Sequence, residues 1–528
     1  MLTNKNTTSK NICKSASSQL EKITNPLIYK QYEKYITTIT NKFKTSQNIL
    51  LNNLFSIKNA IQFKITYIEK PLDKYNSIPP FIDIFRYLIS KNEVINKFTL
   101  DEQNLLKTHL ASHHSKEECY KFLEKNKLGQ KILDLYYSIS QSLKSELIAK
   151  YPSIEFHSLL INSFTSFKII EDLELRIKKL VLYSIEWNEQ KIENLVYLFI
   201  YDNHMQNHKH KQNHNNKVYN NIDYQNIGNE IISRILFFNK FLEIDKLPSK
   251  FIIFLTNNKK EIDENVISHM HFKTINVNTA VTNGHDIIIY RQQELLKSIF
   301  HELIHFHNLD FRNIPSELIQ YLIKTHNIKE NNEYLLYECA TEALANILNN
   351  LFFSKSLKDF IHNLKVEIMF STFQVAKILT ICKYNNWDEF ARVDKINNTN
   401  PNKQFKQDSC VLSYYILKFY IMLNLDTYIK KCLDTKLKFI QTTESFNNLI
   451  HIFDIARKNI CIKKIIDSYL HELYNTTNHN LQNKLTSKYT SKTSKHTSKT
   501  RKTSKTSKIN KTLRMTCLES NLFSKSSI

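Results

Sequence analysis

Glycine is scarce in this chain, with three glycines and eight prolines among 528 residues. Antiparallel sandwiches and nucleotide-binding sheets need glycine at many turns, because few other residues tolerate a positive φ. The length suggests two to four domains and gives ample material for a buried core. We therefore predict an α+β fold that is predominantly helical, with a small mixed sheet.

The stretch His301-Glu302-Leu303-Ile304-His305 has the H-E-x-x-H pattern. On a helix its two histidines lie one turn apart and about 40° from each other around the axis, so both imidazoles can reach one cation. Glu302 lies close enough to contact a water on that cation without being a ligand. The flanking apolar residues recur at helical spacing and predict an amphipathic helix. Zinc hydrolysis needs this division of roles.

Short strands are expected before this helix. Residues 251–256 and 286–290 are apolar runs, and residues 275–282 alternate in part. The dipeptide Asn283-Gly284 is a strong signal for a tight hairpin turn. Strand, turn, strand and then the metal-binding helix is the order that such a site requires.

A second helix is expected over residues 331–348, where Glu338 and Glu342 share one face because they are four residues apart. In the fitting assignment Glu338 is the third metal ligand. Glu342 then accepts a hydrogen bond from the non-coordinating nitrogen of a ligand histidine, which fixes its tautomer. Glu317, in the first turn of an intervening helix expected from residue 315, remains an alternative third ligand.

H-E-x-x-H followed downstream by Glu-x-x-x-(Asp/Glu) resembles the gluzincin branch of the zincin metallopeptidases, over roughly residues 250–355. The resemblance implies a zinc-dependent metallopeptidase that hydrolyses peptide or protein substrates and pairs them with a strand within residues 275–290. It also implies that His301, His305 and Glu338 are the ligands of one Zn²⁺. Glu302 would then be the general base, and Glu342 the carboxylate that hydrogen-bonds to a ligand histidine. Glu342 occupies a position where Asp is commoner in gluzincins, and the segment that connects His305 to Glu338 is long.

In gluzincins a Tyr, His or Arg from the downstream domain stabilises the tetrahedral oxyanion. Here Tyr414 and Tyr415 lie in the apolar run 410–424 and are the candidates, of which we take Tyr415. The alternative role for either tyrosine is structural, with a buried hydroxyl that finds a partner in the core.

Composition and apolar spacing divide the chain into five parts. They are a disordered segment (1–25), a helical region (26–245), a zincin-like catalytic subdomain (246–355), a helical subdomain (356–475) and a disordered Lys/Ser/Thr-rich tail (476–528). Within the second part, four segments have helix-like patterns: 81–89, 104–110, 131–139 and 191–200.

Eleven Lys and Arg residues and no acidic residue lie between Lys484 and Arg514, which is nearly half of the formal net charge of +23. This stretch has too little apolar surface to fold and is expected to bind nucleic acid or acidic surfaces nonspecifically. The alternative to a peptidase is thus a non-catalytic helical protein that binds polyanions through its tail and carries a structural or decayed zinc site. A metal hydrolase with a non-peptide substrate is a further alternative.

The eight cysteines form no CxxC pair, which favours a reducing compartment over a disulfide framework. A tract with His204, His208, His210 and His214 lies among polar residues and indicates a loop. Without a signal peptide or an apolar run of membrane-spanning length, we expect a soluble, cytoplasmic protein. The Asn-, Lys- and Ile-rich composition resembles that of large DNA viruses or AT-rich protists, so association with a virion is a further expectation.

Overall fold

The computed structural model of this chain describes most of residues 25–472 and a short distal segment. The described residues are 25–71, 81–110, 114–150, 167–201, 223–256, 258–260, 262, 271–272, 277–328, 334–392, 405–407, 409–472 and 513–519. The expectations for residues 1–24, for the histidine-rich tract and for the tail up to residue 512 fall outside these ranges.

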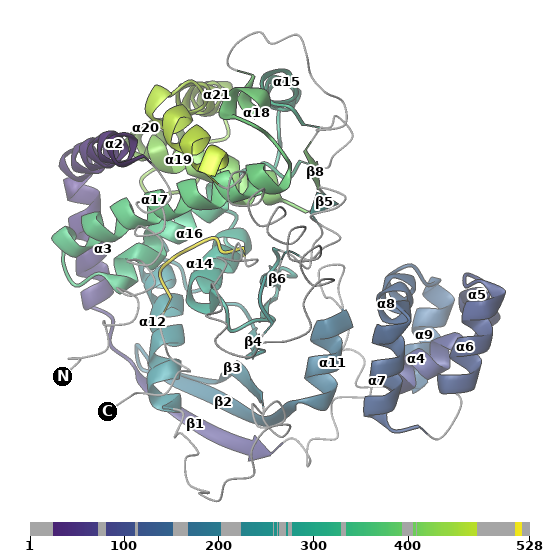
Figure 1. Ribbon diagram of the computed structural model, residues 1–528. Helices are drawn as coiled ribbons and strands as arrows, with labels where there is room; N and C mark the ends of the chain where they lie inside the picture. Colours follow the sequence, from purple (N-terminus) through teal and green to yellow (C-terminus); the bar gives the residue numbers. More distant parts are fainter. Residues whose placement is uncertain are drawn as a thin grey trace, which may run out of the picture.

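The fold is α+β and predominantly helical, with one small mixed sheet, as the scarcity of glycine predicts (Figure 1). Six strands follow the order β1-β2-β3-β4-β7-β6. The first three pair antiparallel, β3, β4 and β7 run parallel, and β6 returns antiparallel to β7. Their bounds are Lys64–Pro71 (β1), Ile177–Trp187 (β2), Gln190–Tyr201 (β3), Lys250–Phe254 (β4), Ala280–Thr282 (β6) and Asp286–Ile289 (β7).

The strands expected near the H-E-x-x-H helix are confirmed as β4 and β7, and the strand expected within residues 275–282 forms at its end, as β6. Gly284 turns the chain between β6 and β7 with a φ of 87°, a conformation that other residues rarely adopt. This hairpin makes β6 the outer strand of the sheet beside the helix that carries the motif.

One expected helix is wrong, because residues 191–200 belong to strand β3. The turn before it has positive φ at both Asn188 and Glu189, as in a type I′ hairpin, although it lacks the usual glycine. Residues 195–200 of this strand are largely buried and pack on both faces of the sheet, so this apolar run does not alternate and periodicity cannot separate it from a helix. The region 26–245 is therefore not purely helical, since it supplies half of the sheet.

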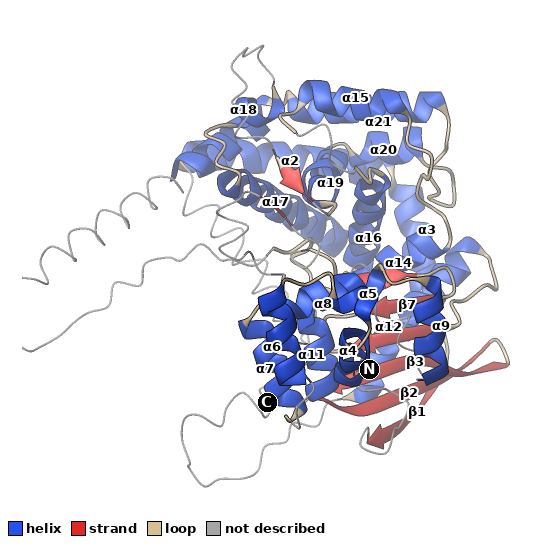
Figure 2. Ribbon diagram, turned by 90° about the vertical axis from the view of Figure 1, so that its right-hand side faces the viewer, coloured by secondary structure: helices blue, strands red, loops and turns tan. Residues whose placement is uncertain are grey.

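Helices cover both faces of the sheet. On one face, α12 (Tyr224–Leu242) packs in the larger apolar cluster, which continues into the helical part of the molecule. On the other face a smaller cluster joins the sheet to a group of short helices, which Figure 2 shows in front of the strands. These helices are α4 (Phe81–Ile89), α5 (Asn92–Ile95), α6 (Leu100–Leu110), α7 (Lys116–Lys125), α8 (Leu128–Tyr137), α9 (Gln141–Lys150) and α11 (Phe167–Leu175), and they confirm the helices expected at 81–89, 104–110 and 131–139.

The remaining helices pack together above the sheet in Figure 1 and confirm the helical character expected for residues 356–475. The apolar run 410–424 is a buried core element that begins as a π-helix, η5. The bounds are α2 (Pro26–Ser46), α3 (Asn48–Asn59), α14 (Leu295–Phe306), α15 (Ser316–Thr325), α16 (Tyr337–Phe353), α17 (Leu357–Ile381), α18 (Trp387–Ala391), η5 (Leu412–Leu417), α19 (Lys418–Leu423), α20 (Leu425–Cys432) and α21 (Thr443–Arg457), with a small parallel pair β5 (His271–Phe272) and β8 (Lys406–Gln407) at the side.

The expected disordered tail is wrong for residues 513–519, which return to the core. Leu513 and Cys517 are fully buried, and Met515 and Leu518 are almost so. Four apolar side chains in six residues are too short a signal to stand out beside a long polar stretch, which explains the wrong boundary. Among the residues that the structure describes, no helix is long and apolar enough to cross a membrane.

Candidate metal centre

The H-E-x-x-H motif lies on α14, as its apolar spacing predicts, and this helix is buried along nearly its whole length. It contacts α12 and α16 as well as strands β6 and β7. Because β7 ends only a few residues before α14 begins, the sheet fixes where the helix starts. The motif is therefore held in a rigid part of the fold.

Helix α16 packs against α14 and carries both downstream glutamates on one face. It begins at Tyr337, later than the expected start near residue 331, so Glu338 lies in its first turn and Glu342 one turn further on. The buried small residues Ala340, Ala343 and Ala345 lie along the same helix, and small side chains let neighbouring helices approach each other closely.

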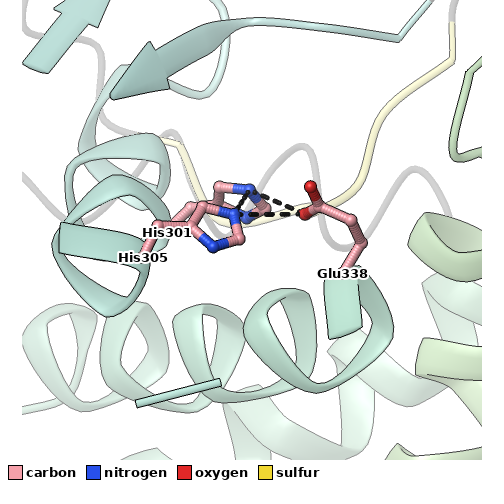
Figure 3. Close-up of side chains that lie close together, drawn as sticks. All are labelled: His301, His305 and Glu338. Carbon is pink, nitrogen blue, oxygen red and sulfur yellow. Dashed lines mark hydrogen bonds and ion pairs between the residues drawn. The ribbon is translucent and has the colours of Figure 1, made fainter. Parts of the chain in front are cut away.

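Three potential ligand atoms converge between the two helices (Figure 3). The Nε2 atoms of His301 and His305 are 3.2 Å apart. The Oε2 atom of Glu338 lies 3.2 Å from the first and 3.3 Å from the second. The structure thus brings together the three residues that the sequence predicts as metal ligands.

Each imidazole is oriented by a carboxylate on its other nitrogen. His301 Nδ1 lies 2.9 Å from Glu342 Oε2, and His305 Nδ1 lies 2.8 Å from Asp310 Oδ2. An ionised carboxylate only accepts hydrogen bonds, so each Nδ1 carries the proton. This arrangement fixes both rings with Nε2 facing the point of convergence, as in metal sites with an outer carboxylate.

A cation between the inner atoms would stabilise this arrangement. When both histidines are neutral, two Nε2 lone pairs and one carboxylate oxygen face the same point, and these groups repel one another. Glu338 Oε2 is buried and has no hydrogen-bond partner of normal geometry among the described residues. A metal ion at this point would satisfy all three atoms.

The charges around the centre lower the pKa of its acids, and the same carboxylates raise the pKa of His301 and His305 against the effect of burial. Burial opposes the charge on Glu338, but His305 and His301 hold the pKa of its carboxyl at about 2. Burial likewise opposes the charge on Glu342, while Lys297 and His301 keep the pKa of that carboxyl well below its usual value. Both acids are therefore ionised at neutral pH.

Glu302 lies on the same helix and is buried, with an exposure of 3%. Burial raises the pKa of its carboxyl, against the opposing influence of His301 and His305. No group among the described residues donates a hydrogen bond to it, so it can accept a proton. The charges of both histidines and of Glu338 also contribute to this pKa.

The two candidate tyrosines are consecutive residues of η5. The ring centroid of Tyr414 is 5.9 Å from that of His301. Burial raises the pKa of Tyr414 well above its usual value, with further contributions from Glu338 and Glu302. Burial also raises the pKa of Tyr415, the residue chosen from the sequence, with contributions from Glu294 and Glu342, and its buried hydroxyl has no hydrogen-bond partner among the described residues. Single-turn π-helices are frequent at functional sites.

The alternative third ligand, Glu317, is exposed on α15 and contacts the hydroxyl of Ser316 rather than the histidines. The intervening helix expected from residue 315 is confirmed as α15. His307 stacks on Phe238, with ring centroids 5.5 Å apart, and does not take part in the centre.

Sequence reasoning missed two residues of the centre, Asp310 and Lys297. Asp310 returns toward His305 because α14 ends at Phe306 and Asn308 then adopts a positive φ of 52°. An Asn at this place is a common way to end a helix and was the available signal. Lys297 lies four residues before His301, so helical spacing already places it on the same face.

The fold and the centre together define an α+β protein with a buried His-His-Glu cluster able to hold a metal ion. Comparison with protein families, curated proteins and solved structures finds no match for this chain. The geometry of the centre is thus the basis for a functional proposal.

Proposed function

We propose that this protein is a zinc-dependent metallopeptidase in which His301, His305 and Glu338 hold one zinc ion. The observation that supports this most directly is the spacing of the three donor atoms, which lie 3.2, 3.2 and 3.3 Å apart. Nitrogen and oxygen ligands at about 2.0–2.1 Å from a tetrahedral zinc ion lie about 3.3–3.4 Å from one another. Two histidines and a glutamate with an open fourth position form a known catalytic zinc set.

A zinc ion held by His301, His305 and Glu338 would lower the pKa of a bound water toward neutrality and polarise the scissile carbonyl. Glu302 accepts a proton from the attacking water and delivers it to the leaving amine. The raised pKa of the Glu302 carboxyl brings it closer to the working pH, which favours proton transfer in both directions.

The tetrahedral oxyanion needs a hydrogen-bond donor, and the position of Tyr414 supports this residue rather than Tyr415. Its ring is adjacent to His301, and its raised pKa keeps the hydroxyl protonated. A preorganised donor of this kind contributes to catalysis because it is already in place when the charge develops.

The edge strand β6 supports a peptide as the substrate. Among the described strands, β6 pairs only with β7, so no described strand occupies its other edge. It also contacts α14, which carries His301 and Glu302. An extended peptide added to this edge would pass close to the centre, with its affinity coming from backbone hydrogen bonds.

The test combines metal analysis with peptide-library digestion. The full chain is expected to bind one zinc ion and to cleave peptides, and removal of zinc with a chelator abolishes cleavage. Glu302→Gln keeps zinc and loses cleavage by at least about 100-fold, as expected for loss of a general base. His301→Ala and His305→Ala lose both.

His307→Ala is the matched control, because this histidine follows the same helix but lies outside the cluster. It should retain both zinc and activity. If Glu302→Gln cleaves peptides at the wild-type rate, the assignment of the general base is wrong.

A second candidate function follows from the eleven basic residues between Lys484 and Arg514 and the formal net charge of +23. A non-catalytic protein that binds polyanions would bind nucleic acid with a steep dependence on salt concentration. Zinc bound at one equivalent without cleavage of any library peptide would favour this candidate over the peptidase.

A further inference from the structure

The distal segment, Leu513–Glu519, packs into the core against residues that are far from it in the sequence. Figure 1 shows it as a yellow trace that runs past α14 and α16. Leu513 donates its backbone N–H to the carbonyl of Lys260 over 2.7 Å, and the side chain of Asn349 on α16 donates to the carbonyl of Leu518 over 3.2 Å. The segment therefore has specific polar contacts in addition to its buried apolar side chains.

The segment donates hydrogen bonds to two buried carboxylates. The backbone N–H groups of Met515 and Thr516 both donate to Glu294, the second over 3.0 Å. The Thr516 hydroxyl and the Cys517 backbone N–H donate to Glu367 over 2.9 and 3.0 Å. Glu294 and Glu367 are at most 1% exposed, so water cannot replace these donors.

The same segment supplies acceptors to three buried lysines. Lys418 donates to the backbone carbonyl of Met515 over 2.8 Å. The Met515 sulfur lies 3.4 Å from the ammonium groups of both Lys260 and Lys297. None of the three lysines is more than 3% exposed.

These contacts connect the segment to the metal centre. The Lys297 ammonium group lies 2.7 and 2.8 Å from the two carboxylate oxygens of Glu342, and Glu342 accepts the hydrogen bond that orients His301. Three lysines and three glutamates thus form one buried network behind the centre: Lys260, Lys297, Lys418, Glu294, Glu342 and Glu367. The distal segment contacts every member except Glu342, which it reaches through Lys297.

We propose that the distal segment is an intramolecular ligand of this network, and that its docking strengthens metal binding by fixing Lys297, Glu342 and hence the ring of His301. The inference rests on the metal site proposed above. It makes the segment a positioning element, because none of its residues contacts the ligand atoms.

The physical basis is the cost of buried charge. When the segment leaves, two carboxylates lose backbone donors and three ammonium groups lose acceptors, so the network must rearrange or admit water. Loss of an outer partner of a ligand histidine typically weakens metal binding about 10–100-fold. Coupling between two binding events is reciprocal, so metal binding must favour docking by the same factor.

The test uses the full chain with substitutions in the segment. Thr516→Pro removes one backbone donor to Glu294 and the hydroxyl donor to Glu367, whereas Thr516→Ser keeps both. We expect zinc affinity, measured by competition with a chromophoric chelator, to fall about 10–100-fold in Thr516→Pro and to be restored in Thr516→Ser. The absorption spectrum of bound Co²⁺ should change only in the proline variant.

A second pair of variants separates positioning from packing. Met515→Ala removes the sulfur beside Lys297 and should weaken zinc binding. Met422→Ala removes a methionine that is equally buried on α19, and should lower stability without changing zinc affinity.

Hydrogen exchange in the unmodified chain tests the same coupling without any substitution. Addition of zinc should slow exchange at the amides of Met515 and Thr516. The factor of slowing should equal the factor by which undocking of the distal segment weakens zinc binding. This measurement decides the question if Thr516→Pro does not fold.

The possible failures are distinguishable. Zinc affinity that is unchanged in Thr516→Pro, or exchange at Met515 that is unaffected by zinc, overturns the coupling and leaves the metallopeptidase proposal intact. A full chain that binds neither zinc nor cobalt overturns the proposed function and the coupling together.

Discussion

Replacing Lys297 with methionine measures how strongly the buried charge behind the centre contributes to folding. The Lys297 ammonium group lies 2.7 and 2.8 Å from the two oxygens of Glu342, and the two side chains are 3% and 0% exposed. Methionine has a similar length without the charge, so Lys297→Met leaves Glu342 buried with only His301 and a long hydrogen bond from Asn346, over 3.5 Å, as its partners among the described residues. Removing one member of a buried pair costs about 3–5 kcal/mol, a large part of the roughly 5–15 kcal/mol that stabilises a typical protein.

The assay is urea-induced unfolding in the presence of a chelator, so that bound metal makes no contribution to the free energy of unfolding. The double variant Lys297→Met/Glu342→Leu should recover most of the loss, because an apolar replacement of a buried ion pair is often neutral or stabilising. Lys365→Met is the control, since Lys365 forms a partly exposed pair with Glu33 over 2.9 Å and should lose at most about 1 kcal/mol. A loss below about 1 kcal/mol in Lys297→Met, or no recovery in the double variant, would refute the reasoning.

Two further predictions test other parts of the molecule. Asp310→Asn keeps the shape of the side chain but loses the negative charge that orients His305, so zinc affinity should fall about 10–100-fold in a chelator competition; an unchanged affinity would mean that the 2.8 Å contact is incidental. Burial, with a contribution from Arg457, lowers the pKa of His326 to about 3. Below about pH 6.5 the unfolded chain therefore binds a proton that the folded chain does not, and stability falls by about 1.4 kcal/mol per pH unit until about pH 3. His326→Gln should flatten the pH dependence of urea unfolding between pH 4.5 and 6.5, and an identical slope would contradict the assignment.

The proposed ligands could be predicted as pairs because helix geometry alone determines the relation within each pair. His301 and His305 on α14, and Glu338 and Glu342 on α16, are each four residues apart, so the spacing places each pair on one helix face whatever the tertiary structure. The packing of α14 against α16 was not determined by spacing. The sequence predicted this packing only through the resemblance to gluzincins. The converging donor atoms of His301, His305 and Glu338 agree with that prediction.

The features that the sequence did not reveal depend on tertiary contacts or on local backbone conformation. Asp310 reaches His305 only because the chain turns at Asn308 after the helix ends. Residues 195–200 of strand β3 lack alternation because they pack on both faces of the sheet, and the hairpin turn before the strand lacks glycine. Residues 513–519 are anchored partly by backbone donors to buried carboxylates, and backbone donors leave no trace in a sequence pattern.

The buried network is hard to explain by stability alone. Six charged side chains with almost no exposure lie where an apolar core of the same volume would often be as stable or more stable. The position of Glu342 gives a reason for them, because an ionised carboxylate must face His301 to fix its tautomer, and a buried carboxylate needs a cation beside it. Lys297 supplies that cation, and Glu294, Lys260 and the distal segment then complete its surroundings. On this argument each charge follows from the need to hold one imidazole in place, so replacing the whole network with apolar residues should yield a stable protein with weakened metal binding.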